Sequence, residues 1–332
     1  AAYQRVPEPA RNETMAAREV LSLYRLRRIS EANKAAGQFK KTYKTATEWI
    51  ARFEVEKGRY QLAVRNPKKA RQIFGDISKK YPTTEAAADA RYYIIRAYRD
   101  EGPDKDGNND PYLNALTTFI KNYPDSPHWA NANIELAEFW ERNEEYNLSA
   151  RAYRNAIEKG VSQSEKPDIL QKLAKNYGNL NAYDLAINFA RQLIREFPQD
   201  PLALGARIDI GTIYLPNKGA HAQAIAELRP LLKIVTEESK KANIQYAIAE
   251  NYFEMADYEN ALREFLILRY NQKAGPMWIV SAQMKVADAY AAQGKIEQAI
   301  HELEAIKRSH GAASMYGIGA EKRIQQIKTQ SE

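Results

Sequence analysis

The histidines and carboxylates of this chain are the residue types that could act as catalysts or metal ligands. The four histidines, His128, His221, His301 and His310, are far apart and follow no ligand spacing such as HExxH. No pair of carboxylates stands out for acid–base work. The chain contains no cysteine, which removes thiolate nucleophiles and zinc–thiolate sites. We therefore expect neither an enzyme nor a bound cofactor.

One segment has the residue types of a calcium loop. It reads DKDGNND at residues 104–110, with oxygen ligands at alternate positions around a glycine. That glycine stands fourth rather than sixth, and Ala115 takes the place of the final glutamate of an EF-hand. Asp, Asn and Gly also favour ordinary polar turns, and this is the interpretation we prefer. A calcium site here would use Asp104, Asp106, Asn108 and Asp110.

The N-terminal region is strongly basic. Residues 1–80 hold 19 lysines and arginines against 8 acidic residues, whereas the remainder holds 30 against 34. Such an asymmetry attracts anionic partners, which include acidic proteins, lipid headgroups and nucleic acid. A solvated helix face would have the same composition. The candidate basic arm consists of Arg18, Arg25, Arg27 and Arg28.

Regular spacing of small and aromatic residues indicates the elements that carry these side chains. From Ser149 onward, a small residue recurs at intervals of 37 or 38, and an aromatic residue recurs at nearly the same interval. A period of this length is typical of stacked helix pairs. The small residues are Ala70, Ala115, Ser149, Ala186, Ala224, Ala261 and Ala299, and the aromatic residues are Tyr98, Trp140, Tyr177, Tyr214, Tyr252 and Tyr290.

The unit is clearest at residues 243–270. Its first helix presents Ala249 three residues before Tyr252, and its second presents Ala261, Phe265 and Leu268. We expect the alanines where the two helices cross and the larger residues in the gaps between units. This pattern resembles the tetratricopeptide repeat over roughly residues 42–310, although the spacing exceeds the usual 34 residues.

The resemblance implies an all-α fold. It would be a right-handed superhelical solenoid of about seven helix pairs with helical caps at both ends. We expect an extended leader at residues 1–11, where Pro7 and Pro9 oppose a helix, and a basic N-terminal helix at residues 12–41. The solenoid would cover residues 42–310, and a capping helix would cover residues 311–332.

Two junctions between repeats are similar to those of bacterial envelope proteins. They read Tyr81-Pro82-Thr83-Thr84 and Tyr123-Pro124-Asp125-Ser126. The most similar types are the outer-membrane-protein assembly lipoprotein and the periplasmic coordinator of the Tol–Pal system. This resemblance implies a periplasmic or outer-membrane-associated protein, with the cytoplasm as the alternative. No run of about 18 apolar residues is present to span a bilayer, which leaves peripheral membrane association open.

In this family the first helix of each pair lines the concave face, which binds partners. The function implied is a non-catalytic scaffold for other proteins in assembly or maintenance of the envelope. The alternative is a polyanion binder that uses the basic arm, with nucleic acid the disfavoured partner. The concave-face candidates are Asp89, Tyr92, Arg96, Arg99, Asn131, Ile134, Glu138, Gln171, Lys175, Asn243, Tyr246 and Glu250.

Overall fold

A computed structural model of the chain describes residues 12–102 and 110–331. All regular elements in these ranges are helices, and the ranges contain no strand, as an all-α solenoid requires. The leader expected at residues 1–11 lies outside the described residues, as does nearly all of the candidate calcium loop at 104–110. Both therefore stay predictions.

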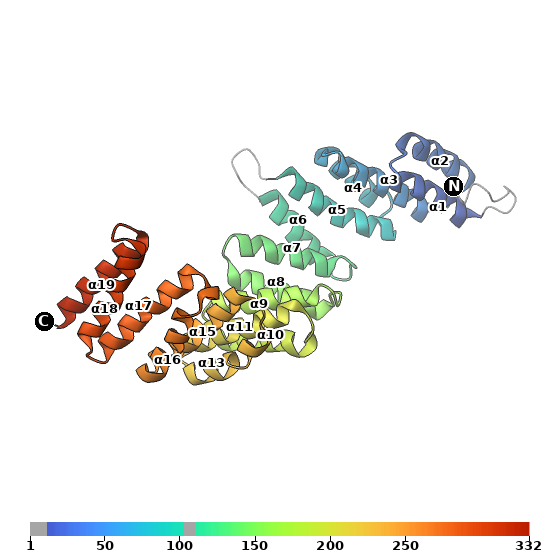
Figure 1. The fold of residues 1–332 in the computed structure, drawn as a ribbon. Helices are drawn as coiled ribbons and strands as arrows, with labels where there is room; N and C mark the ends of the chain where they lie inside the picture. The colour runs from blue at the N-terminus through green and yellow to red at the C-terminus, as the bar shows by residue number, and fades with distance from the viewer. Residues whose placement is uncertain (1–11, 103–109, 332) are drawn as a thin grey trace. The chain divides into compact units, whose positions relative to one another are not determined.

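The helices form two compact units, residues 1–162 and 163–332, which we call the first and the second unit. In each unit, consecutive helices pack as pairs, and each pair packs on the next (Figure 1). The first unit contains α1 (Glu13–Arg25), α2 (Ile29–Thr42), α3 (Thr47–Ala63), α4 (Pro67–Lys80), α5 (Glu85–Glu101), α6 (Asp110–Asn122), α7 (Trp129–Arg142) and α8 (Tyr146–Lys159).

The second unit continues the same pairing and ends on an unpaired helix. One of its first helices is interrupted by a π-helical turn, η3 (Ile210–Tyr214). Its other elements are α9 (Lys166–Asn179), α10 (Tyr183–Glu196), α11 (Pro201–Asp209), α12 (Leu215–Asn217), α13 (His221–Leu228), α14 (Leu231–Ile234), α15 (Glu238–Glu254), α16 (Tyr258–Arg269), η4 (Gln272–Ala274), α17 (Pro276–Ala292), α18 (Ile296–His310) and α19 (Met315–Ser331).

Packing within the pair α15–α16 confirms the expected roles of its small and large residues. Ala249 and Ala261 are fully buried, which allows the two helix backbones to approach closely. Phe265 and Leu268 are buried in the same cluster, against the following helix α17. The closing helix α19 buries its apolar stripe of Ala320, Ile324 and Ile327 and so covers the last pair.

Two details of the predicted elements were wrong. The basic N-terminal segment, expected as one helix, forms the two helices α1 and α2, because the chain turns at Arg27 with φ +60°. In α6, the slot expected for Ala115 belongs to Tyr112, which is buried while Ala115 is only partly buried. The interval from Ala70 to Tyr112 is 42 residues, the same as that between Tyr98 and Trp140.

The junctions between pairs are capped differently from one another. Thr84 caps α5, because its hydroxyl accepts a hydrogen bond from the backbone N–H of Ala87 at 3.1 Å. Ser126, by contrast, accepts from the N–H of His128 at 3.2 Å and so caps the preceding turn. The residue at the N-cap of α7 is His128, which makes no side-chain capping bond.

The turns within pairs share one backbone geometry. A residue with positive φ follows the first helix, and the next backbone N–H reaches back five residues to a carbonyl, as in the Schellman motif. Examples are the bonds from Asp257 N to Tyr252 O and from Lys295 N to Tyr290 O, both at 2.9 Å. The positive-φ residues of these turns are Arg27, Arg65, Glu144, Asn181, Gly219, Ala256 and Gly294.

We expect the substitutions Ala256→Gly and Gly294→Ala, in the last two of these turns, to change the free energy of unfolding in opposite directions. Left-handed backbone costs an L-residue about 1 kcal/mol or more relative to glycine. Ala256→Gly should therefore raise the free energy of unfolding by about 0.5 kcal/mol, after the added flexibility of the unfolded chain is subtracted. Gly294→Ala should lower it by about 1 kcal/mol. Urea unfolding of both variants checks this, and a loss of stability in Ala256→Gly would contradict it.

Candidate partner-binding faces

The first helices of successive pairs form one face of each unit. In the first unit this face includes α5 and α7, and in the second it includes α9, α11, α15, α17 and α19. All twelve concave-face candidates lie on these helices. The contacts of their side chains, however, differ strongly between the two units.

In the first unit, several candidates surround a buried carboxylate, Glu135 on α7. Its Oε1 accepts a hydrogen bond from the Tyr92 hydroxyl at 2.6 Å, and its Oε2 accepts one from the Tyr112 hydroxyl at 2.9 Å. The Arg99 guanidinium lies 3.2 Å from the same carboxylate. Only 10% of the Glu135 side chain is exposed. Burial, and then the charge and hydrogen bond of Glu135, raise the pKa of both tyrosines well above the usual range.

A second contact pair adjoins this network. The Tyr92 ring stacks on the His128 ring with centroids 4.7 Å apart, and His128 Nε2 lies 2.7 Å from the Asp89 carboxylate. Asp89, Tyr92 and Arg99 are thus brought together, but their polar groups already have partners within the protein. Their role toward another molecule stays a prediction.

Among the other candidates of the first unit, Arg96 also acts on this network, because its charge opposes the rise in the pKa of the Tyr92 hydroxyl. The Arg96 guanidinium lies 5.6 Å from the centroid of the Tyr93 ring, which is a cation–π contact. Asn131 is exposed and Ile134 is partly buried. Glu138 is half-buried and interacts with other residues of the protein.

In the second unit, the first-helix face contains a cavity of about 390 Å³ formed by α15, α17 and α19. Tyr246 comes from α15, and the remaining lining residues come from α17 and α19. We call this cavity the C-terminal groove. Its lining residues are Tyr246, Ser281, Met284, Lys285, Asp288, Gly319, Lys322, Arg323 and Gln326.

Ion pairs connect the three helices along this groove. Lys285 Nζ lies 2.9 Å from Glu250 Oε1, and Arg323 Nε lies 2.6 Å from Asp288 Oδ1. The Tyr246 ring packs against Phe265 and Trp278. Burial, and then the charge of Glu250, raise the pKa of the Tyr246 hydroxyl above its usual range. The candidates Tyr246 and Glu250 therefore belong to one charged, aromatic-lined surface. The third candidate on α15, Asn243, is partly buried and lies about one helical turn before Tyr246.

Of the two candidates on α9, Lys175 lies near a carboxylate of the neighbouring first helix, Asp209. Burial raises the pKa of Asp209 above its ordinary 3.8, and the charge of Lys175 offsets only part of this shift. Asp209 directly precedes the π-helical turn η3. Lys175 is exposed and Gln171 is partly buried.

The raised pKa of Asp209 predicts a pH-dependent effect of Asp209→Asn. Because the fold disfavours the charged carboxylate, the penalty from Asp209 grows as the pH rises from 3.8, its pKa in the unfolded chain, to its higher pKa in the folded protein, and is complete above that. Below 3.8 the residue is protonated in both states and this penalty is absent. Asp209→Asn should therefore stabilise the protein at pH 7, and the gain should vanish as the pH falls to about 3.5. Urea midpoints measured across this range check the sign.

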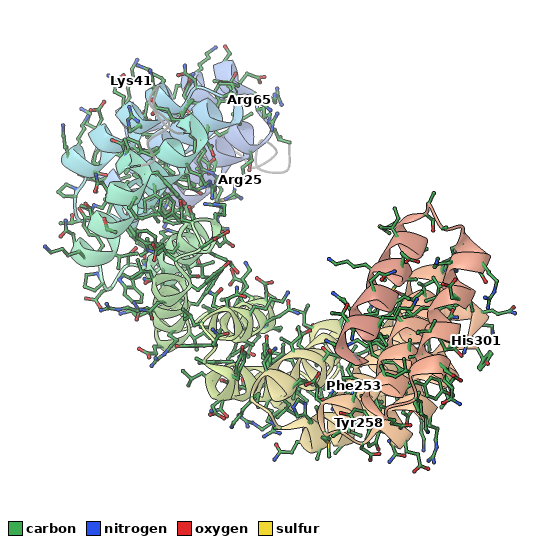
Figure 2. All side chains as sticks on the ribbon, turned by 90° about the vertical axis from the view of Figure 1, so that its left-hand side faces the viewer. Arg25, Lys41, Arg65, Phe253, Tyr258 and His301 are labelled. Carbon is green, nitrogen blue, oxygen red and sulfur yellow. The ribbon has the colours of Figure 1, made fainter. Side chains whose placement is uncertain are left out.

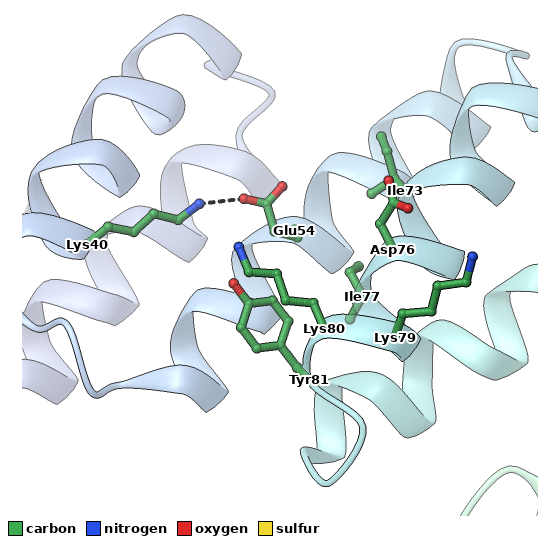
Figure 3. Close-up of a pocket in the computed structure, with 8 residues that line it drawn as sticks. All are labelled: Lys40, Glu54, Ile73, Asp76, Ile77, Lys79, Lys80 and Tyr81. Atoms are coloured by element: carbon green, nitrogen blue, oxygen red, sulfur yellow. Dashed lines mark hydrogen bonds and ion pairs between the residues drawn. The ribbon is translucent and has the colours of Figure 1, made fainter.

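A larger cavity, of about 520 Å³, lies in the first unit among α2, α3 and α4 (Figure 3). Lys40 on α2 donates to Glu54 on α3 at 2.6 Å, and Lys57 also donates to Glu54, at 3.0 Å. Burial alone would raise the pKa of Glu54, but these two hydrogen bonds outweigh it and lower the pKa. Lys79 and Lys80 line the same cavity.

The histidines and the basic arm occupy separate places. His221 Nδ1 lies 2.9 Å from the Asn251 side-chain oxygen, His310 packs edge-on against Tyr316, and His301 is exposed (Figure 2). Within residues 12–102 and 110–331, no group of three or more His, Asp or Glu side chains has the arrangement of a metal site. In the basic arm, Arg25, Arg27 and Arg28 are exposed around one turn, while Arg18 lies earlier on α1.

Several residues of these sites were missed in the sequence. Glu135 lies three residues after Ala132 and four before Phe139, on the apolar stripe of α7, and a carboxylate there was a usable signal for a buried polar network. The groove pairs Glu250–Lys285 and Asp288–Arg323 each join opposite charges 35 residues apart, which is about one repeat. That offset could have identified them.

Comparison with known proteins agrees with this architecture. Residues 89–126 and 168–200 match the tetratricopeptide repeat family model. The apo form of RapI has 15% identity and a TM-score of 0.52, covering 78% of this chain and 76% of that chain. A tetratricopeptide repeat protein from Parabacteroides merdae has 12% identity and a TM-score of 0.42, covering 84% and 98%.

At these identities the similarity to RapI concerns the fold alone. No curated protein matches the chain. Among the described residues, no helix combines the length and apolarity needed to cross a bilayer. The two matched segments and the paired-helix fold together support the tetratricopeptide repeat family for this chain.

Proposed function

We propose that this protein is a non-catalytic scaffold that holds a segment of a partner protein in the C-terminal groove. The observation that carries the proposal is the groove itself, because three first helices supply a hollow with charged, aromatic and aliphatic walls. A few placed polar groups around apolar surface are typical of binding sites. No enzyme family is indicated by the comparisons.

The groove suits an extended segment that carries a carboxylate beside an apolar side chain. Glu250 and Asp288 are each engaged by a cation, so the walls are fixed before a partner arrives. Lys322 is exposed at the groove and has no ion-pair partner among the described residues. It can therefore receive a partner's carboxylate, while Met284 and the Tyr246 ring offer apolar surface.

Site-specific photo-crosslinking in the native cells tests this proposal. A crosslinking residue at position 281, inside the groove, should capture one defined partner, whereas the same residue at exposed position 267 on α16 should not. Lys322→Glu should weaken that capture about 10-fold through charge repulsion. The matched reversal Lys273→Glu, in the turn η4 away from the groove lining, should leave it unchanged. Equal capture from positions 281 and 267 would contradict a groove-binding function.

We further propose that the partner is an envelope component and that the protein acts in the periplasm or at the outer membrane. Support comes from the two Tyr-Pro junctions and from the absence of cysteine in the chain. Fractionation of cells after crosslinking tests the location separately from the groove. Recovery of the protein and its partner in the cytosol alone would refute the envelope role but would leave the scaffold function intact.

A further inference from the structure

Two successive turns of the first unit each present an apolar side chain surrounded by cations. The turn between α1 and α2 reads Arg25-Leu26-Arg27-Arg28, and the turn between α3 and α4 reads Val64-Arg65-Asn66 before Pro67-Lys68-Lys69. Leu26 is 68% exposed and Val64 is 49% exposed. Leu26 and Val64 are 38 residues apart and occupy equivalent places in their repeats.

Both turns lie at the same edge of the first unit. Helix α1 packs beside α3, and each reaches this edge at its C-terminal end before the chain turns back. Figure 2 shows Arg25 and Arg65 toward one side of the first unit and Lys41, at the end of α2, toward the opposite side. We call these two turns, residues 25–28 and 64–69, the basic edge.

The charges of the basic edge are mostly available. Arg25, Arg27 and Arg65 are exposed and have no ion-pair partner among the described residues. Arg28 pairs with Glu31, and Lys68, which is 78% exposed, has only a 3.8 Å contact with Glu101. The edge therefore carries a clear excess of positive charge around its two aliphatic side chains.

The cations are specific to these two turns. Arg27 and Arg65 have φ of +60° and +57°, a conformation that glycine adopts with less strain. The equivalent places in later turns hold Glu144, Asn181, Gly219, Ala256 and Gly294. None of these later residues is a cation, so the positive charge at this place distinguishes the first two turns from the rest.

We propose that the basic edge docks on an anionic lipid surface. Guanidinium and ammonium groups bind lipid phosphates, and aliphatic side chains between them can enter the headgroup region. Leu26 and Val64 project from turns between helices into solvent. Projecting side chains of this kind can insert into a deformable surface such as a lipid headgroup layer. A nucleic acid backbone would use the cations but would gain little from exposed aliphatic residues.

Flotation of the full chain with vesicles tests this. The probes are vesicles of phosphatidylcholine alone and of phosphatidylcholine with about a third phosphatidylglycerol, a fraction chosen to give a strongly negative surface. The charge variant is the double substitution Arg27→Gly and Arg65→Gly, which suits the positive φ at both sites and so preserves the fold. The apolar variant is Leu26→Ser with Val64→Ser.

Binding should occur only to the anionic vesicles. Loss of the two arginines should weaken it about 30-fold, and loss of the two aliphatic side chains about 10-fold. The control Lys41→Gln with Lys44→Gln removes equal charge elsewhere in the same unit, and Leu180→Ser with Met255→Ser removes equivalent exposed apolar residues in the second unit. Both controls should change binding less than 3-fold.

Three outcomes would overturn the proposal. The first is no binding to anionic vesicles, and the second is an equal loss of binding in the two controls. The third is tighter binding to duplex DNA that depends on the arginines and not on Leu26 or Val64. Because the basic edge and the C-terminal groove lie in different units, failure here would leave the scaffold proposal standing.

Discussion

Replacing Glu135 with alanine is expected to lower the free energy of unfolding of the first unit by about 3 kcal/mol. The carboxylate accepts hydrogen bonds from two tyrosine hydroxyls and faces the Arg99 guanidinium, and its side chain is 90% removed from water. Truncation would leave the Tyr92 and Tyr112 hydroxyls without a hydrogen-bond acceptor. Each buried polar group that lacks a partner costs about 1–3 kcal/mol. The loss should exceed that of any exposed substitution on α7.

Urea unfolding monitored by tryptophan fluorescence can measure this effect, because Trp49, Trp129 and Trp140 all lie in the first unit. Glu135→Gln keeps an acceptor but gives up the charge, so we expect an intermediate loss of about 1–2 kcal/mol. The matched control is Asn131→Ala at an exposed position of the same helix, with a change within about 0.5 kcal/mol. Equal effects of Glu135→Ala and Asn131→Ala would show that the network contributes nothing.

Gly58→Ala should destabilise the first unit by about 2 kcal/mol, although alanine favours helices more than glycine does. In the middle of α3, a Cβ at Gly58 would lie 2.3 Å from the ring of Phe74 on α4. Phe74 is fully buried, so its ring has little space into which it could move. Overpacking of this kind costs about 1–3 kcal/mol and outweighs the propensity gain of about 1 kcal/mol.

Two other helical glycines of the first unit provide the control. A Cβ at Gly37 on α2 or at Gly75 on α4 would meet no atom within 4 Å. Gly37→Ala and Gly75→Ala should therefore stabilise the protein by about 0.5–1 kcal/mol each. Thermal unfolding of the three variants distinguishes the cases by sign. A stabilising Gly58→Ala would mean that the pair α3–α4 opens more easily than its packing indicates.

The sequence by itself determined the helix pairs. Their period of 37–38 residues, the buried alanines and the turns after the first helices all follow from local rules, because small side chains permit close helix crossing and each unit repeats the same contacts. The fully buried Ala186, Ala224, Ala261 and Ala299 confirm this. The resemblance to the tetratricopeptide repeat placed the candidate residues on the first helices, but it did not indicate which of those residues form contacts within the protein.

The tertiary structure determined which candidate residues contact other residues of the protein, because burial and pairing depend on the position and register of the neighbouring helix. Tyr92 and Arg99 contact Glu135 only because α7 lies beside α5 in the register that brings Glu135 within reach. Tyr112 occupies the position of the small residue in α6, and from there its hydroxyl donates to the same carboxylate. Likewise, the one-repeat offset between Asp288 and Arg323 suggests a pair, but only the packing of α19 against α17 brings the two side chains to 2.6 Å. The sequence specifies which side chains share a face, whereas packing sets the distances between them.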